Sequence, residues 1–228
     1  MKHVVIFSGA GISAESGLKT FRDTDGLWEN YKIEEVATPE AFENNPQLVL
    51  EFYNMRRKQV LEAQPNAAHF SILDLEKNFN VQIITQNIDD LHERAGSKNV
   101  LHLHGEILKA RSTKTHLTYL INGHEIKPGE LCENGYQLRP DIVWFGEHVP
   151  NMDIAINMCE KADILIVIGT SLNVYPAANL VECVANTCKI YLIDPKDVPL
   201  WKRKNVTQIK MKATEGLPLL IKELSEKK

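Results

Sequence analysis

Short runs of apolar residues, many of them β-branched, alternate along this chain with longer segments of helical spacing. Most of these runs are continuously apolar, which is typical of parallel strands covered on both faces. Alternation of such strands with helices predicts an α/β fold built on an open, doubly wound parallel sheet of the Rossmann type. The predicted strands are His3–Phe7, Val81–Thr85, Val100–Leu103, Asp163–Ile168, Ile190–Ile193 and Thr207–Lys210, and the predicted helices are Gln47–Ala63, Ala67–Lys77, Met152–Lys161, Ala177–Asn186 and Leu217–Lys228.

Two segments interrupt this alternation. Thr20–Gln64 is expected to contain a loop and helices but no strand. Ala110–Arg139 contains the turn signals Asn122-Gly123 and Pro128-Gly129 and is expected to form hairpins or irregular structure. We interpret the two segments as insertions that build a small second lobe on a single domain of residues 1–228. The Rossmann-type core would then comprise about residues 1–19, 65–109 and 140–228, and the small lobe about residues 20–64 and 110–139.

Composition narrows the classes of partner. The 228 residues include 26 basic and 30 acidic side chains, for a net charge of −4. Because no bulk basic field exists, neither nucleic acid nor an anionic membrane is an expected partner. The longest apolar run, Ile164–Ile168, is far shorter than the roughly 20 residues that span a bilayer, and the start MKHVVIFSGAG is too short for a signal peptide. The cysteines, at positions 132, 159, 183 and 188, form no CxxC pair. We expect a soluble, cytoplasmic monomer with reduced thiols.

The first predicted strand leads directly into Gly9-Ala10-Gly11-Ile12-Ser13. Glycines at this point let the backbone approach a diphosphate, and the N-terminus of a following helix would offer N–H groups to the anion. A simple strand–helix turn is the alternative. The acidic residue expected about 20 positions later in a dinucleotide-binding unit is missing, so an ordinary dehydrogenase is not indicated.

Polar clusters follow two other predicted strands. The amides of Gln86 and Asn87 and the carboxylate of Asp89 would lie at the crevice where parallel sheets bind ligands, and could contact ribose hydroxyls and a carboxamide. Thr170 and Ser171, after Gly169, suit phosphate contact. For both clusters the alternative is a helix cap, in which Asn87, Asp89 or one of the two hydroxyls accepts a backbone N–H.

Two histidines, His102 and His104, would point to the same face of a strand. A metal site there would need a further donor that the sequence does not identify. His104, which precedes Gly105 at the expected crevice edge, is a candidate general base because the pKa of histidine lies near neutral pH. A purely structural role is the alternative.

The motifs are more specific in combination than singly. In the order GAGIS, SGLKTFRD, GLW, TQNIDDLH, LHGE, RPDIVWFGE and GTSLNVYPAANL, the chain resembles the sirtuin family from Phe7 to Pro218. That resemblance implies an NAD-dependent protein lysine deacylase in which NAD and an acyl-lysine of a protein substrate meet between two lobes. It implies that His104 is the catalytic base acting on a ribose hydroxyl, with Asn87 beside it, and that the products are nicotinamide, free lysine and O-acyl-ADP-ribose.

The resemblance also implies the remaining site residues. The segment from Val143 to Gly146 would bind the substrate backbone by strand addition and wall the acyl-lysine tunnel. Asp194 stands near the position where many members have asparagine, which makes its ribose contact less certain. The residues implied to bind NAD are Gly9, Ala10, Gly11, Ser13, Phe21, Arg22, Trp28, Gln86, Asn87, Ile88, Asp89, Gly169, Thr170, Ser171, Asp194 and Ala213, and those implied to bind substrate at the tunnel wall are Val143, Trp144, Phe145 and Gly146.

The chain departs from the family at the structural zinc. Most sirtuins bind this zinc with four cysteines in two CxxC pairs, whereas this chain offers Ser112, Thr115, Leu131 and Asn134 at the corresponding stretch, with Cys132 one place out of register. Serine, threonine and leucine do not replace thiolates as zinc ligands, so no metal is expected. An improvised site from His116, His124 and Cys132 is the alternative. We expect packing to hold the lobe instead, through Leu117, Tyr119, Ile121, Ile126 and Leu138.

The preferred acyl group is indicated by Tyr53 and Arg56, which are three residues apart and share one face of a predicted helix. A phenol and a guanidinium on one face can hold a carboxylate, and this Tyr-x-x-Arg pair resembles the subgroup of desuccinylases and demalonylases. The alternative is that Arg56-Arg57-Lys58 is a solvated basic stripe. Two other functions also stay open, mono-ADP-ribosyl transfer and a non-catalytic NAD or ADP-ribose sensor.

Overall fold

The computed structural model describes residues 1–19, 27–28, 31–115, 117–198 and 205–226. All six predicted strands are present and form one parallel sheet in the order β11-β10-β9-β1-β4-β5. The chain leaves β1 toward one edge and later returns to its other side, so the sheet is doubly wound as predicted. The strands are β1 (His3–Ser8), β4 (Asn80–Thr85), β5 (Val100–His102), β9 (Ile164–Ile168), β10 (Lys189–Ile193) and β11 (Val206–Ile209).

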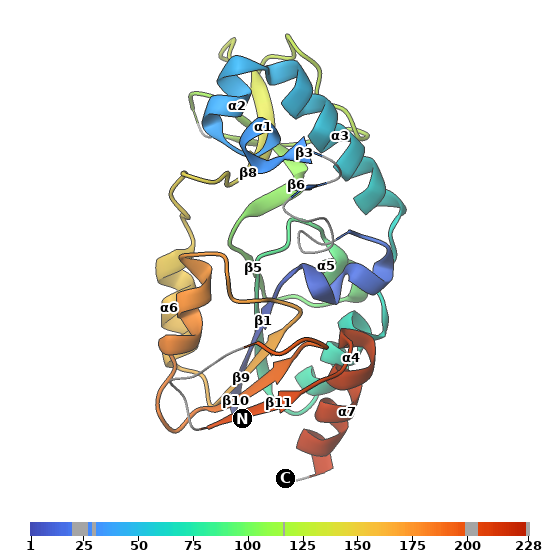
Figure 1. Cartoon of the computed structure of the whole chain (residues 1–228), viewed down its shortest axis with the longest axis vertical. Helices are drawn as coiled ribbons and strands as arrows, with labels where there is room; N and C mark the ends of the chain where they lie inside the picture. The colour runs from blue at the N-terminus through green and yellow to red at the C-terminus, as the bar shows by residue number, and fades with distance from the viewer. Residues whose placement is uncertain (20–26, 29–30, 116, 199–204, 227–228) are drawn as a thin grey trace.

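Helices cover both faces of this sheet. α4 (Ala67–Glu76) and α7 (Ala213–Glu226) lie on one face, and α6 (Met152–Glu160) and the 3-10 helix η3 (Ala177–Glu182) lie on the other (Figure 1). Alternate residues of β1, β9 and β10 therefore enter two separate cores, which explains why these central strands are almost continuously apolar. The helix expected at Ala177–Asn186 is a shorter 3-10 helix, and the last helix begins four residues before the predicted Leu217.

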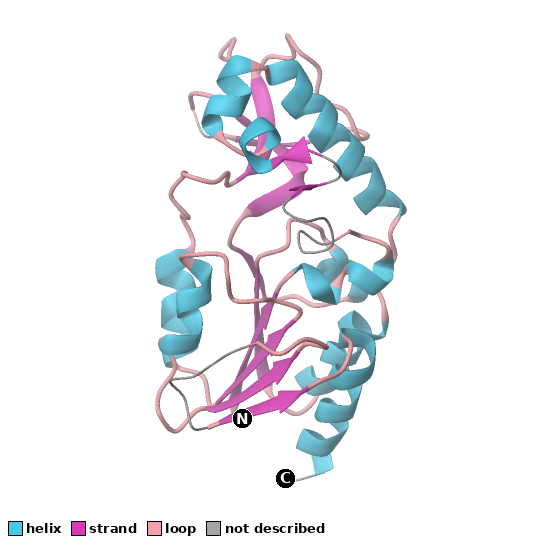
Figure 2. Cartoon of the chain, viewed as in Figure 1, coloured by secondary structure: helices cyan, strands magenta, loops and turns pink. Residues whose placement is uncertain are grey.

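The second group of elements lies beyond the carboxyl ends of the strands (Figure 2). It contains α1 (Ile33–Val36), α2 (Pro39–Asn44), α3 (Pro46–Glu62) and an antiparallel sheet of β7 (Thr118–Leu120), β6 (Gly105–Ser112) and β8 (Leu138–Ile142). β2 (Leu27–Trp28) pairs with β3 (Tyr31–Lys32), so the expectation of no strand in this insertion was wrong. Two-residue strands are too short to give a periodic signal in the sequence.

Packing and one buried arginine hold the antiparallel sheet against α3. Leu50 of α3 packs with Ile126, Cys132 and Leu138, whereas Leu117 is half exposed, so its predicted core position was wrong. Tyr119 and Ile121 are partly buried against the same cluster.

The buried arginine is Arg57, whose side chain is fully inaccessible to solvent. It donates to the carbonyls of Ile107 at 2.6 Å and His124 at 2.8 Å, and to the Asn54 Oδ1 atom at 2.8 Å. Burial lowers its pKa to about 10, so Arg57 stays charged at neutral pH. The solvated-stripe interpretation is therefore wrong for Arg56 and Arg57, which are buried, and holds for the exposed Lys58. No helix within the described ranges is long and apolar enough to cross a bilayer.

Candidate active site

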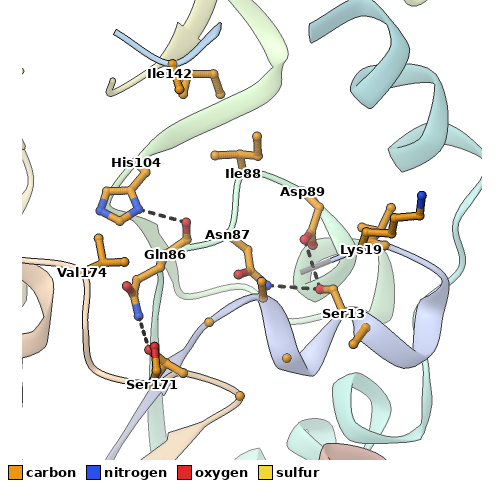
Figure 3. Close-up of a pocket in the computed structure, with 18 of the residues that line it drawn as sticks. Ser13, Lys19, Gln86, Asn87, Ile88, Asp89, His104, Ile142, Ser171 and Val174 are labelled. Carbon is orange, nitrogen blue, oxygen red and sulfur yellow. Dashed lines mark hydrogen bonds between the residues drawn. The ribbon is translucent and has the colours of Figure 1, made fainter. Parts of the chain in front are cut away.

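A cavity of about 530 Å³ lies between the carboxyl ends of β1, β4 and β9 and the small lobe. Figure 3 shows side chains from several elements directed into it. Phe21 and Arg22, and the side chain of Trp28, fall outside the described residues. The other predicted site residues all line this cavity: Gly9, Ala10, Gly11, Ser13, Tyr53, Arg56, Gln86, Asn87, Ile88, Asp89, His104, Val143, Trp144, Phe145, Gly146, Gly169, Thr170, Ser171, Asp194 and Ala213.

The floor of the cavity is a close crossing of two glycine-containing turns. The Gly11 N–H donates to the Gly169 carbonyl at 2.8 Å, and Gly169 has a φ of +64°. A Cβ on Gly11 would lie 2.6 Å from the Gly169 Cα, so a side chain there would force the turns apart. After β1 the chain forms two 3-10 turns, η1 (Ala10–Ile12) and η2 (Ala14–Ser16), rather than the expected helix. The segment directly after β1 therefore offers no α-helix N-terminus to an anion, contrary to the expectation.

Three polar side chains form a hydrogen-bonded network beside this crossing. The Ser13 hydroxyl donates to Asp89 Oδ2 at 3.0 Å and accepts from Asn87 Nδ2 at 3.1 Å (Figure 3). Asp89 Oδ1 also accepts the Leu91 N–H at 3.2 Å, at the start of α5 (Leu91–Ala95), so the capping interpretation holds in part. Burial raises the pKa of Asp89, against the opposing effect of these two hydrogen bonds.

His104 lies on the opposite side of the loop, next to Gln86. Its Nδ1 atom is 3.1 Å from the Gln86 carbonyl oxygen, which can only accept, so Nδ1 carries the proton and Nε2 has the lone pair (Figure 3). Burial lowers the pKa of His104, so the ring is neutral at neutral pH. A neutral imidazole with a fixed tautomer suits a general base. Gln86 is itself oriented by its amide, which donates to Thr170 Oγ1 at 3.0 Å.

At the other end of the cavity lie Tyr53 and Arg56 of α3. Tyr53 is fully buried, and its hydroxyl accepts the Trp144 Nε1–H at 3.0 Å. Burial raises the pKa of Tyr53, so the side chain stays a neutral phenol. Arg56 is 5% exposed and donates to Gln59 Oε1 at 3.1 Å. The pair thus lines an enclosed end of the cavity on which a positive charge and a phenol converge.

The segment that follows β8 connects the two ends. Val143 N–H donates to the His104 carbonyl, and Phe145 N–H donates to the Ala37 carbonyl, both at 3.0 Å. Trp144, between them, is held by its side chain as well as its backbone. Its ring lies 3.3 Å below the guanidinium carbon of Arg139, measured to the ring centroid.

Glu147 completes this arrangement. It accepts the Trp144 N–H at 2.7 Å and two hydrogen bonds from Arg139 at 2.7 and 2.9 Å, and it contacts Arg111 of β6. Burial opposes ionisation of Glu147, but the hydrogen bonds from Arg139 and the Trp144 N–H, together with the charges of Arg139 and Arg111, outweigh it and hold the pKa below its usual range. Sequence reasoning missed Arg139 and Glu147 as site residues, although both stand in the quoted RPDIVWFGE block. It also missed apolar lining residues that carry no sequence signal, among them Ala37, Val60 and Val149.

The donor set of the cavity fits a dinucleotide and not a metal. Amides, hydroxyls and the Asp89 carboxylate lie at one end, and the buried Asp194, whose Oδ1 accepts the Lys196 N–H at 2.9 Å, lies at another. In the small lobe Cys132 Sγ is 3.6 Å from Ser112 Oγ, which gives one thiol where zinc would need several ligands. Among the residues that the structure describes, no group of three or more His, Cys, Asp or Glu side chains could hold a metal; His116 lies outside them.

Comparison with known proteins gives concordant matches. Residues 9–176 match the Sir2 family. The chain is 52% identical over 227 residues to an "NAD-dependent protein deacylase" of Helicobacter pylori strain 26695, which covers 99% of each chain. It is 50% identical over 223 residues to the protein of that name from Bacteroides thetaiotaomicron, with 95% of each chain covered. Among solved structures, a Sir2 homolog in complex with NAD superposes with a TM-score of 0.90 at 41% identity, over 99% of this chain and 90% of the other.

Proposed function

We propose, because this chain belongs to the Sir2 family, that it removes acyl groups from protein lysine with NAD as co-substrate and favours succinyl- or malonyl-lysine over acetyl-lysine. The observation that carries the proposal is one cavity that joins a neutral, oriented His104 to the buried Tyr53 and Arg56. His104 supports the deacylase reaction, and the pair of Tyr53 and Arg56 supports the acyl preference.

In the proposed reaction, bound NAD supplies a ribose carbon from which nicotinamide can leave. The chain supplies positioning and one proton acceptor. Asn87 and Asp89, fixed through Ser13, bind the nicotinamide-ribose end. Nε2 of His104 accepts the proton of a ribose hydroxyl, which then attacks the acyl carbon. Bound NAD and acyl-lysine would fill the cavity and exclude bulk water, so that this hydroxyl takes the acyl group. Overall, acyl-lysine, NAD and one water molecule would give free lysine, nicotinamide and O-acyl-ADP-ribose, with the acyl oxygen taking the place of nicotinamide on the ribose carbon.

We place the substrate peptide along the segment from Val143 to Gly146. The segment runs between the two lobes, anchored by the carbonyls of His104 and Ala37. An extended peptide added beside it would bring its acyl-lysine into the cavity between His104 and Trp144. This placement puts the far end of the acyl chain toward Tyr53 and Arg56.

The preference for acidic acyl groups rests on the chemistry of that pair. A guanidinium can bind a carboxylate with two parallel hydrogen bonds, and a neutral phenol can donate a third. Hydrogen bonds to charged groups contribute about 1.5–3 kcal/mol, or roughly 10- to 150-fold in discrimination. The burial of Arg56 strengthens such an interaction because solvent screens it less. The difference should arise mainly in substrate binding.

A single kinetic panel tests both parts of the proposal. Nicotinamide release is measured with one peptide that carries acetyl-, propionyl-, butyryl-, malonyl-, succinyl- or glutaryl-lysine, and with the unmodified peptide as control. We expect release that depends on the acyl group, with the highest kcat/KM for succinyl- or malonyl-lysine. Highest efficiency with acetyl-lysine would contradict the preference. NAD binding without release would indicate a sensor, and transfer of labelled ADP-ribose to protein would indicate mono-ADP-ribosyl transfer.

A further inference from the structure

His102, the last residue of β5, contacts the cofactor loop 86–89 but is not among the residues that line the cavity. Its side chain is 8% exposed. Nδ1 is 3.0 Å from the Asn87 carbonyl oxygen, and Nε2 is 2.8 Å from Oε1 of Glu93 on α5. The proposed reaction makes no use of His102 or Glu93.

Both partners of this ring accept hydrogen bonds. A carbonyl oxygen has no proton to give, and neither has a carboxylate. A neutral imidazole carries a proton on one nitrogen only, so the other nitrogen would direct its lone pair at an acceptor. The two short contacts are satisfied together only when both nitrogens carry protons. The geometry therefore requires His102 to be an imidazolium.

The residue that this imidazolium holds is Asn87. The backbone N–H of Asn87 donates to Thr85 Oγ1 at 3.0 Å, and its side-chain amide donates to Ser13 at 3.1 Å. His102 supplies the third contact, on the carbonyl oxygen. The positive charge also acts on Asp89, since it lowers the pKa of that carboxyl against the larger effect of burial and so favours the ionised form. One buried charge thus stabilises both polar residues of the nicotinamide end.

We propose that His102 and Glu93 form a charged positioning pair that fixes the cofactor loop 86–89, and that the loop is held in its binding geometry only while His102 carries its second proton. The inference rests on the proposed function to the extent that this loop binds NAD. His102 touches no reacting group, so it acts through Asn87 and is a positioning residue.

The groups around His102 determine how its charge responds to pH. Glu93 and His92 act on it from α5, Asp89 from the cofactor loop and Glu106 from β6. Burial lowers the pKa of His102, but the hydrogen bond and charge of Glu93 outweigh this and raise it overall. His92 is itself neutral, because burial lowers its pKa well below the usual value. His102 is therefore charged at neutral pH, and the pair is lost as the pH rises through the raised pKa of His102.

This response is opposite to that of His104. The lowered pKa of His104 means that the base is available above that pKa, whereas the positioning pair is available below the raised pKa of His102. Activity should therefore fall on both sides of a window between the two histidine pKa values. In a plot of activity against pH, the fall on the acid side would reflect protonation of His104. The fall on the alkaline side would reflect deprotonation of His102.

Two measurements that need no acyl-peptide test the inference. In ¹⁵N-histidine NMR spectra of the wild-type protein at neutral pH, both ring nitrogens of His102 should be protonated. In calorimetric titrations across pH, the Kd for NAD should rise by roughly tenfold as His102 deprotonates, the size of one lost charge-assisted hydrogen bond. ADP-ribose, which lacks nicotinamide, should change less.

Two variants separate positioning from a structural role. Glu93→Gln removes the carboxylate but keeps the ring, so the alkaline limb of NAD binding should move to lower pH. His102→Gln cannot titrate, so its NAD affinity should be roughly tenfold weaker at neutral pH with no alkaline limb. The control is His124→Gln, which replaces a half-exposed imidazole in the small lobe and should leave the pH dependence of NAD binding unchanged.

The outcomes discriminate clearly. A single proton on the His102 ring at neutral pH, or an alkaline limb that persists in His102→Gln, would overturn the inference. If His102→Gln does not fold, the ¹⁵N spectra of the wild-type protein and the NAD titrations of Glu93→Gln still test the inference. Should the wild-type protein release no nicotinamide with any acyl-peptide but show the expected pH dependence of NAD binding, the proposed function fails and the positioning pair stands.

Discussion

The base at one end of the cavity and the predicted acyl-binding residues at the other are oriented by different kinds of group. Beside the large sheet, the His104 ring is oriented by a backbone atom, the Gln86 carbonyl oxygen, although side chains such as Ser13 and His102 hold the neighbouring cofactor loop. Beside the small lobe, Tyr53 and Trp144 are fixed by side chains, through the bond between them and through Arg139 and Glu147. A substitution can remove a side-chain contact, whereas backbone contacts within a sheet persist. The orientation of His104 should therefore tolerate substitutions around it, whereas the orientation of Tyr53 and Trp144 should depend on Arg139 and Glu147.

The largest expected effect concerns the base at the nicotinamide end. His104→Tyr should lower turnover by at least roughly 10²–10⁴-fold, the range typical of losing a general base. NAD affinity should remain nearly unchanged, because the cofactor loop keeps its own contacts. Steady-state kinetics and calorimetry on the same preparation measure the two quantities. Turnover like that of the wild type would remove His104 from the mechanism.

At the acyl end, Arg56→Met should abolish the preference for succinyl- or malonyl-lysine, a loss of roughly 10- to 150-fold in relative kcat/KM. Acetyl-lysine turnover should be spared, because methionine is a flexible apolar side chain that can fill the same space. Lys58→Met, on the exposed side of α3, is the matched control. An equal loss with acidic and neutral acyl groups would argue against a carboxylate clamp.

In the cofactor loop, Asp89→Asn should reduce nicotinamide exchange by about 10- to 100-fold, because it removes the charge of a buried carboxylate. Asparagine retains an oxygen that can accept the Leu91 N–H, so the start of α5 should persist and the melting temperature should change little. Asn87→Ala should likewise impair exchange with the fold preserved.

A different result would support the capping interpretation. If Asp89→Asn or Asn87→Ala lowers the melting temperature strongly without NAD and causes no specific loss of exchange, these residues are structural caps. Circular dichroism melts of both variants, recorded with and without NAD, make that distinction.

The side-chain network at the acyl end should show a smaller kinetic effect. Glu147→Gln keeps an acceptor for the Trp144 N–H but leaves Arg139 without its counter-charge. We expect KM for the acyl-peptide to rise by about tenfold, with NAD affinity unchanged. The free energy of unfolding should fall by about 2–3 kcal/mol. This is at or below the lower end of the cost of breaking a buried ion pair, because the Glu147 side chain is 20% exposed.

The pH dependence of that stability difference has a definite sign. The folded-state pKa of Glu147 lies below its usual value of 4.5. Its contribution to stability is therefore present above pH 4.5 and is lost as the pH falls through the lowered pKa. Denaturant unfolding of wild type and Glu147→Gln should converge at acid pH. A constant difference across the range would assign the effect to packing alone.

The smallest expected effect is that of removing metal. If packing and the Arg57 hydrogen bonds hold the small lobe, a strong chelator should leave the melting temperature and NAD-dependent activity unchanged. Elemental analysis of the purified protein should find no stoichiometric zinc. Zinc at one equivalent would refute the prediction and would indicate a metal site in the small lobe.

The sequence by itself determined the large sheet and much of the cavity. The central strands β1, β9 and β10 are apolar runs because they are buried between two helical layers, so their positions could be predicted to within one or two residues. Polar residues that directly follow such strands, such as Asn87 and Thr170, must reach the same edge of the sheet, because parallel strands share a direction. Their presence in one cavity follows from that rule.

Tertiary structure decided what depends on contacts between distant segments. Arg56 and Arg57 read alike in the sequence, but packing directs Arg56 to the cavity and Arg57 to the carbonyls of two small-lobe segments. His102 and His104 were expected on one face, yet β5 ends at His102, which contacts Glu93, whereas His104 lines the cavity. Local pattern encodes whether a residue is buried in a strand or helix. Which partner a buried charge meets is set by how those elements pack, and that is fixed only in the folded chain.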